Sequence, residues 1–124
     1  MAAPNIVNVS TITGVTTAVG LGTTAPVTFL SNTASSNKVF KVNTLMAVNI
    51  DGTVSVDTTI KYHLSAAGAG TSIPIAYTVS VPADSSLVVI GKDNPIYLEE
   101  NRSLTAQATS ANTLSIVCSY EDIS

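Results

Sequence analysis

The chain has 124 residues and a formal net charge of −3, a length that fits one domain. Only 10% of its residues are charged, against about 25% in an average soluble protein, and its five basic residues are too few for the clustered positive charge of a nucleic-acid-binding protein. One cysteine and one histidine exclude a disulfide within the chain and a zinc site built from these residue types.

The first segments of the chain predict three weak strands, over residues 5–12, 14–20 and 25–30. They are weak because Gly14, Gly20-Leu21-Gly22 and Pro26 interrupt them. An alternating strand that ends before a glycine is a usual form for an exchanged segment. We therefore expect residues 1–12 to form an N-terminal arm or an exchanged strand, and residues 13–124 to form the β-sandwich domain.

The clearest pattern is a pair of alternating segments over residues 39–50 and 53–64. Asp51 and Gly52 lie between them, and this dipeptide favours a type I′ turn because it tolerates positive φ. The sequence therefore predicts a β-hairpin. Its expected core-facing residues are Phe40, Val42, Thr44, Met46, Val48 and Ile50 in the first strand and Val54, Val56, Thr58, Ile60, Tyr62 and Leu64 in the second.

The middle of the chain begins with small residues over 65–72, which we expect to form a flexible loop. A strand follows over residues 72–81. Pro74 has no N–H to donate to a neighbouring strand, so this strand is expected to be irregular or to lie at a sheet edge. The residues on its expected core face are Ile73, Ile75, Tyr77, Val79 and Val81.

Four further strands are predicted over residues 86–91, 96–98, 103–109 and 113–120. No segment has a sustained helical period with capping residues. The chain is therefore expected to be all-β, a single antiparallel β-sandwich of jelly-roll or immunoglobulin-like type with about eight to ten short strands. The last two long strands are expected to turn Leu104, Ala106 and Ala108, and Leu114, Ile116, Cys118 and Tyr120, toward the core.

The residues that could carry catalysis are isolated in the sequence. His63 is expected on the polar outer face of its strand, as a surface or interface histidine. Asp57 is the nearest carboxylate on that face, but at about 3.3 Å per residue it lies roughly 20 Å away, too far to orient the imidazole. Cys118 is expected to be a small buried hydrophobic residue rather than a reactive thiol. We therefore predict no catalytic residues and no enzymatic activity.

Two weaker ligand hypotheses remain open. Oxygen atoms of Asp93, Asn94, Glu99 and Glu100 could gather around a calcium ion, although solvated loop charge explains these residues better. A sugar-binding site needs an exposed aromatic ring, and Tyr97 is the one tyrosine not assigned to the core. We predict no metal and no cofactor.

The chain also has no apolar run of the roughly 18 residues that a membrane span requires. The N-terminus has neither the basic start nor the apolar core of a signal peptide. We therefore expect synthesis and assembly in a reducing cytoplasm, and no membrane partner. Short side chains such as serine and threonine replace the missing charges at the surface, and they lose little entropy when they pack against another protein. This composition favours a subunit of an assembly.

Three stretches of the chain resemble a known group of proteins. These stretches read PNIVNVSTITGVTTAV, VFKVNTLMAVNIDGTVSVDTTI and VPADSSLVVIGKDNPIYLEENRSLTAQATSANTLSIVCSYEDIS. They are similar to small virion structural proteins of tailed bacteriophages, especially phages of marine cyanobacteria. The resemblance implies a non-enzymatic component of the head or tail, with no catalytic residues to carry over.

The expected function is that of a capsid decoration or cement protein on the outer surface of the phage head, made in the host cytoplasm. The expected partners are the major capsid protein and further copies of the chain, with a trimer favoured. The acidic character of the chain favours this outer surface over a DNA-lining one. The alternatives are a tail, neck or fibre subunit and a glycan- or receptor-binding module. The expected contacts are the N-terminal arm, loops 31–38, 65–72 and 91–96, and outward-facing Val39, Leu45, Ala47 and Val117.

Overall fold

The computed structural model describes residues 9–124, which form β-strands and one short 3-10 helix. The expected N-terminal arm falls largely outside the described residues. Its described end pairs with the C-terminus of the same chain, because the Ser10 and Thr11 amides both donate to the Ser124 carbonyl, at 2.9 and 3.1 Å. The elements are β1 (Ile12–Gly20), β2 (Val27–Asn32), β3 (Val39–Asn49), β4 (Val56–His63), η1 (Ala66–Gly68), β5 (Ser72–Val81), β6 (Ser86–Ile90), β7 (Ile96–Leu98), β8 (Arg102–Ala108) and β9 (Leu114–Ile123).

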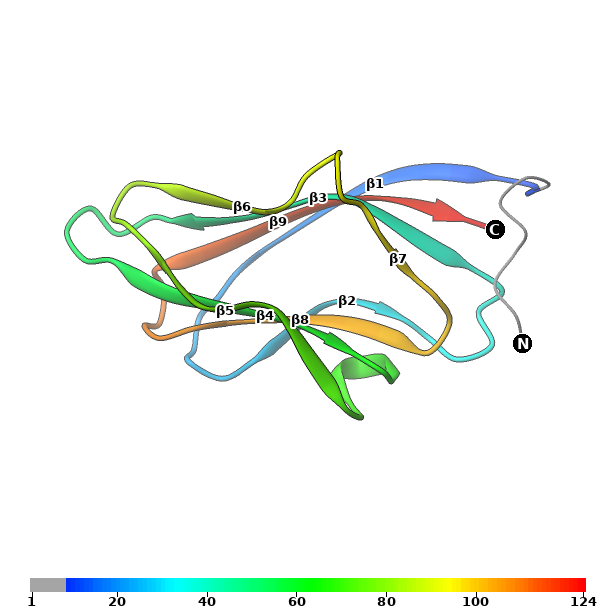
Figure 1. The fold of residues 1–124 in the computed structure, drawn as a ribbon, viewed down its shortest axis with the longest axis horizontal. Helices are drawn as coiled ribbons and strands as arrows, with labels where there is room; N and C mark the ends of the chain where they lie inside the picture. The colour runs from blue at the N-terminus through cyan, green and yellow to red at the C-terminus, as the bar shows by residue number, and fades with distance from the viewer. Residues whose placement is uncertain (1–8) are drawn as a thin grey trace.

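The strands form two antiparallel sheets that pack against each other, which confirms the predicted β-sandwich (Figure 1). The first sheet has the order β1-β9-β3-β6, with β7 also paired to β3, and the second has the order β2-β8-β4-β5. The pairs are nested, since β1 joins β9, β2 joins β8, β3 joins β6 and β4 joins β5. A chain that folds into one long antiparallel hairpin and then wraps into two sheets gives this strand order. The sandwich is therefore of the jelly-roll type.

The predicted hairpin of residues 39–50 and 53–64 is wrong. Strand β3 lies in the first sheet and β4 in the second, so the connection between them crosses from one layer to the other. The local structure between the two strands favours this crossing over a tight turn. The Asp51 carboxylate accepts hydrogen bonds from the Thr53 and Val54 amides, at 2.8 and 3.3 Å, which lowers the pKa of Asp51. Gly52 is not among the residues with positive φ, which a type I′ turn requires.

A β-bulge explains the next correction. The pairing of β3 with β9 shifts register between Val42 and Thr44, which turns the following residues to the opposite face. Leu45 and Ala47 are therefore fully buried, although the alternation predicted that they face outward. The residues predicted for the core beyond the bulge, Thr44, Met46 and Val48, are only half-buried, and Ile50 is exposed. Val39 was also expected to face outward and is buried.

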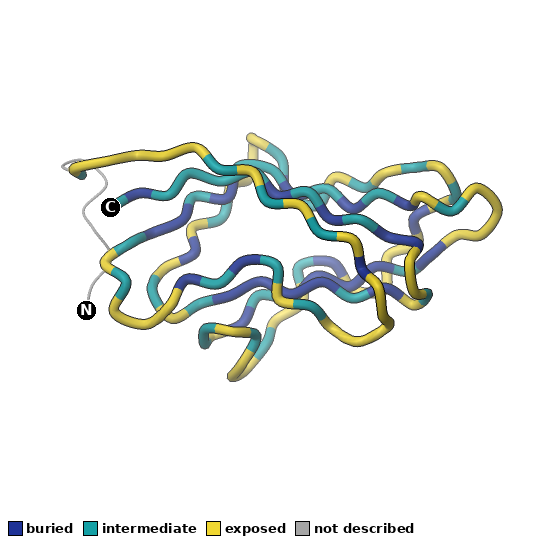
Figure 2. The backbone as a smooth tube through the Cα atoms, turned by 180° about the vertical axis from the view of Figure 1, so that it is seen from behind, coloured by how far each residue is buried: buried dark blue, intermediate teal, exposed yellow. Residues whose placement is uncertain are grey.

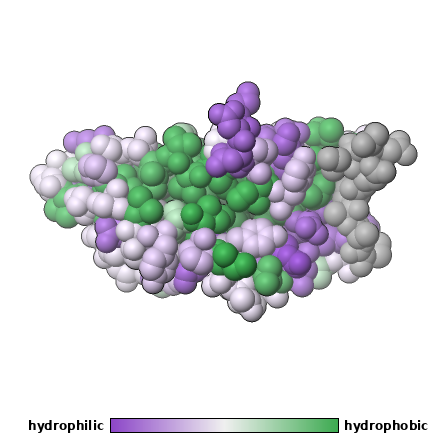
Figure 3. All heavy atoms as spheres, viewed as in Figure 1, coloured by the Kyte–Doolittle hydropathy of each residue, from purple (hydrophilic) through white to green (hydrophobic). Residues whose placement is uncertain are grey.

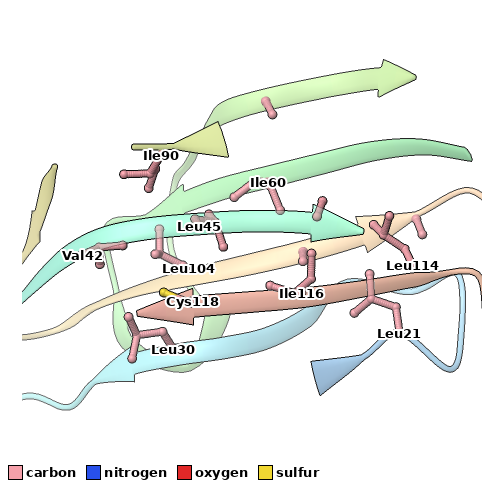
Figure 4. Packing of buried hydrophobic residues seen from close by; sticks show 14 of the residues in the cluster. Leu21, Leu30, Val42, Leu45, Ile60, Ile90, Leu104, Leu114, Ile116 and Cys118 are labelled. Carbon is pink, nitrogen blue, oxygen red and sulfur yellow. The ribbon is translucent and has the colours of Figure 1, made fainter. Parts of the chain in front are cut away.

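The core lies between the two sheets, and its pattern in the later strands is as predicted. Leu104, Ala106 and Ala108 of β8 are buried, and so are Leu114, Ile116 and Cys118 of β9. Figure 4 shows several of these side chains pointing into the space between the layers. Tyr120 is half-buried and packs on Phe40 with ring centroids 5.0 Å apart. In β4, Val56, Thr58 and Ile60 are buried as predicted, Tyr62 is half-buried, and the flanking Val54 and Leu64 are exposed.

Strand β5 lies at the edge of the second sheet, as Pro74 predicted, and its pairing with β4 shifts register twice. Thr78 has a φ of 47°, which marks a bulge. These irregularities overturn most of the predicted core face. Val81 is buried and Ile75 is half-buried, but the exposed fractions are 55% for Ile73, 66% for Tyr77 and 36% for Val79. Figure 2 shows the buried segments lying inside the sandwich and the exposed ones in loops and edge strands.

Two buried asparagines join the sheets at their ends. The Asn32 side-chain amide, at the end of β2, donates to the carbonyls of Lys38 and Leu98, at 2.9 and 3.0 Å. The Asn49 amide, at the end of β3, donates to the carbonyls of Val54 and Val81, at 2.9 and 3.0 Å. Both N–H donors of each amide are therefore satisfied, as burial requires. Each asparagine ties a strand end of one sheet to backbone of the other.

Candidate interaction surfaces

His63 lies on the outer face of the second sheet but is buried, which corrects the predicted surface position. Its Nε2 atom is 2.9 Å from the Thr105 hydroxyl, and its buried Nδ1 has no hydrogen-bond partner among residues 9–124. The imidazole contacts a hydroxyl here rather than a carboxylate. The geometry therefore does not supply the carboxylate that a catalytic histidine of the expected kind would need.

The predicted flexible loop 65–72 is folded back onto this same outer face. The Ala67 amide donates to the Ser31 hydroxyl at 2.9 Å, and the Gly68 amide donates to the Ser103 hydroxyl at 2.8 Å. Gly68 has a φ of 71°, and a Cβ at this position would lie 2.6 Å from Oγ1 of Thr28. Glycine is therefore required for the close approach of the loop to β2.

Cys118 is buried, as predicted, and burial raises the pKa of its thiol from 9.0 to about 12. The unfolded chain therefore loses this proton at lower pH than the folded chain does. The contribution of the thiol to stability is complete below pH 9 and is lost as the pH rises toward 12.

We expect the free energy of unfolding to fall above pH 9 by up to about 1.4 kcal/mol per pH unit from this group alone. Urea denaturation at several alkaline pH values, compared with a Cys118→Val variant, isolates the effect from other titrating groups. Equal pH slopes for the two proteins would show that burial does not hold the thiol proton.

Two of the four residues proposed for a calcium site accept hydrogen bonds from nearby backbone. The Asn94 side-chain oxygen accepts from the Gly91 amide, and Glu100 accepts from the Asn37 amide, both at 3.0 Å. Asp93 and Glu99 are exposed. Among residues 9–124 no group of three or more histidine, cysteine or acidic side chains is placed to hold a metal ion.

Two of the three loops expected to make contacts touch each other, since the Ala67 amide of loop 65–72 donates to the Ser31 hydroxyl of loop 31–38 at 2.9 Å. Figure 1 shows η1 beneath the second sheet and the β6–β7 connection above the first. The β2–β3 connection is held inward by Asn32, whose side-chain oxygen accepts a hydrogen bond from Ser36. The β6–β7 connection therefore lies apart from the 65–72 loop, on the opposite side of the sandwich.

A continuous apolar surface does lie along one side of the sandwich, where the edge strands of both sheets come together. We call this surface the apolar edge and define it by Ile73 and Val79 of β5, Val88 of β6 and Tyr97 of β7, with exposed fractions of 55, 36, 60 and 42%. Half-buried apolar side chains extend it toward the core. Figure 3 shows hydrophobic side chains gathered on this side.

Within residues 9–124, β5 and β6 are the last strands of their sheets, so one side of each presents backbone groups that no described strand pairs. Open edges with apolar side chains are liable to pair with other chains. Pro74 and the bulge at Thr78 make β5 irregular, which limits how well another strand can pair with it. Pro74 is the feature of the sequence that points to this surface. It predicts an edge strand, and the side chains on both faces of an edge strand lie near solvent.

The outer face of the second sheet has a polar groove next to the apolar edge. Its volume is about 360 Å³, and its floor is formed by β4 and β8. Tyr77 and Thr78 of β5 form one side, and Thr24 of the β1–β2 connection forms the other. The sequence did not predict this groove, because Tyr77 was assigned to the core.

Comparisons with protein-family models, with curated proteins and with solved structures find no match to the chain. Within the part of the chain that the structure describes, no helix is long and apolar enough to cross a membrane. The fold and surfaces described above therefore define the chain only as a jelly-roll β-sandwich with an open apolar edge.

Proposed function

We propose that the chain is a non-enzymatic structural subunit of a tailed bacteriophage, and within the virion a decoration protein on the outer surface of the head. The apolar edge carries the proposal. Four exposed hydrophobic side chains on three neighbouring edge strands are costly in water, and a protein partner that covers them removes this cost. Low surface charge and the resemblance to phage virion proteins support the same conclusion.

The proposed mechanism is cementing of the shell. The apolar edge joins copies of the chain into an oligomer, with a trimer favoured, and the oligomer binds across neighbouring subunits of the major capsid protein. Only the assembled lattice offers that composite site, so binding stabilises the shell by mass action. The short serine and threonine side chains on the remaining surface lose little entropy on contact.

The proposal is tested on virions that contain the chain. Heads with and without it are heated, and DNA release is followed by dye fluorescence. We expect heads without the chain to release DNA at a lower temperature, and addition of the purified protein to restore the original temperature. Identical release temperatures would contradict the cementing role.

The copy number of the chain, measured by mass spectrometry relative to the major capsid protein, separates the head from the alternatives. Hundreds of copies support the head. A handful of copies would instead indicate a neck, tail or fibre subunit.

A further inference from the structure

The polar groove on the second sheet has unused hydrogen-bonding capacity. Asp57 and Lys61 lie on the same face of β4, four residues apart, or about 13 Å along the strand. Among residues 9–124, neither the carboxylate nor the ammonium has a hydrogen bond or an ion pair. At this separation the two groups leave a space between them that a ligand can bridge.

The floor of the groove adds both donors and acceptors. Gln107 donates from Nε2 to the Thr24 carbonyl at 3.1 Å, which leaves its side-chain oxygen free to accept. The Thr59 hydroxyl accepts from the Thr78 amide, and the Thr109 hydroxyl accepts from the Asp57 amide, both at 3.1 Å. Each of these hydroxyls keeps its own proton to donate. The backbone bonds fix all three side chains without using up their capacity.

One aromatic ring borders these polar groups. Tyr77 is 66% exposed and lines the groove from the bulge in β5. The bulge at Thr78 places it there, next to Ala76, which is buried. An exposed ring beside a polar floor offers a flat apolar face with a negative π-cloud, against which polarised C–H groups pack well.

This combination selects the chemical class of the ligand. The groove holds one carboxylate and one ammonium, so their charges cancel and favour neither an anion nor a cation. Closely spaced donors and acceptors match neighbouring hydroxyl groups, each of which donates and accepts. A C–H face together with a ring of hydroxyls is the surface of a sugar. The volume of about 360 Å³ fits one to two such rings.

We propose that this groove binds a neutral pyranose sugar, with Tyr77 packing against the ring and with Asp57 and Gln107 accepting hydrogen bonds from its hydroxyls. The inference goes beyond the proposed virion role and uses a surface separate from the apolar edge. A decoration protein with such a groove would attach the particle to glycans as well as stabilise the shell.

The experiment is saturation-transfer NMR on the full chain with D-glucose, D-galactose, D-mannose and N-acetyl-D-glucosamine as probes, followed by titration of the sugar with the strongest signal. We expect saturable binding of at least one sugar. We expect Tyr77→Ala and Asp57→Asn each to raise the dissociation constant about tenfold.

The matched control is Tyr97→Ala, which removes an exposed tyrosine from β7 outside the groove and should change the dissociation constant less than twofold. Thermal unfolding shows whether each variant is folded. Where a variant is not, Tyr77→Phe is used in its place, and we expect it to raise the dissociation constant by a smaller factor. No binding of any of the four sugars, or binding that Tyr77→Ala and Asp57→Asn leave unchanged, would overturn the inference. Neither result depends on whether the chain stabilises phage heads.

Discussion

An Asn49→Ala variant is expected to lose about 3 kcal/mol of unfolding free energy, a large share of the total for a domain of this size. The Asn49 side chain is 1% exposed and donates two hydrogen bonds across the sandwich, to the carbonyls of Val54 and Val81. Its oxygen also accepts from the Asp51 amide at 2.9 Å. Alanine leaves all three backbone groups without this partner, and the Val81 carbonyl, whose bond is buried, then costs more than the bond itself contributes.

Urea denaturation measures this loss, and Asn43→Ala is the matched control. Asn43 lies on the same strand but is half-buried, and its amide donates to the Glu121 carboxylate at 2.9 Å. We expect this variant to lose less than about 1 kcal/mol of unfolding free energy, because water replaces the lost hydrogen-bond partner. Similar losses for both variants would show that Asn49 does not join the sheets.

A Val88→Lys variant is expected to prevent self-association of the chain. Val88 is 60% exposed on β6, so lysine should leave the free energy of unfolding nearly unchanged. In an assembled interface the same lysine would bury a charge without a partner, which weakens binding by far more than tenfold. Light scattering coupled to size-exclusion chromatography gives the mass of each protein in solution.

Thr16→Lys is the control for this experiment, since Thr16 is exposed on β1 at the opposite edge of the first sheet. It should assemble like the unmodified chain. A monomeric unmodified chain, or a Val88→Lys variant that still forms the same oligomer, would contradict assembly through the apolar edge.

The core faces of β8 and β9 could be predicted from the sequence because the alternation in their central residues is unbroken. Every second residue is apolar from Leu104 to Ala108 in β8 and from Leu114 to Tyr120 in β9, and the structure buries all of them except Tyr120, which is half-buried. Strand β3 has an equally clear pattern that misleads, because apolar residues occupy both of its faces. Only the bulge at Val42 decides which set is buried, and a bulge depends on pairing with β9, far away in the sequence.

The predicted hairpin failed for a related reason. A turn dipeptide such as Asp51-Gly52 reports only local geometry, whereas the buried Asn49 binds backbone of β5 and of the segment before β4. The alternation of apolar and polar residues gives no sign of this interaction between the two sheets. The candidate surfaces share this origin, because the exposure of Tyr77 and Val79 follows from the irregular edge position of β5 rather than from their residue types.

The position of β9 determines when the first sheet can form during synthesis on the ribosome. Strand β9 is the central partner of both β1 and β3, and it pairs Ile12 with Ile123 across nearly the whole chain. Until β9 has been synthesised, β1 lacks the strand it pairs with, and β3 lacks one of its partners in the first sheet. The first sheet therefore forms only after residues 114–123 have been added, and because this step requires contacts between distant residues, it is intrinsically slow.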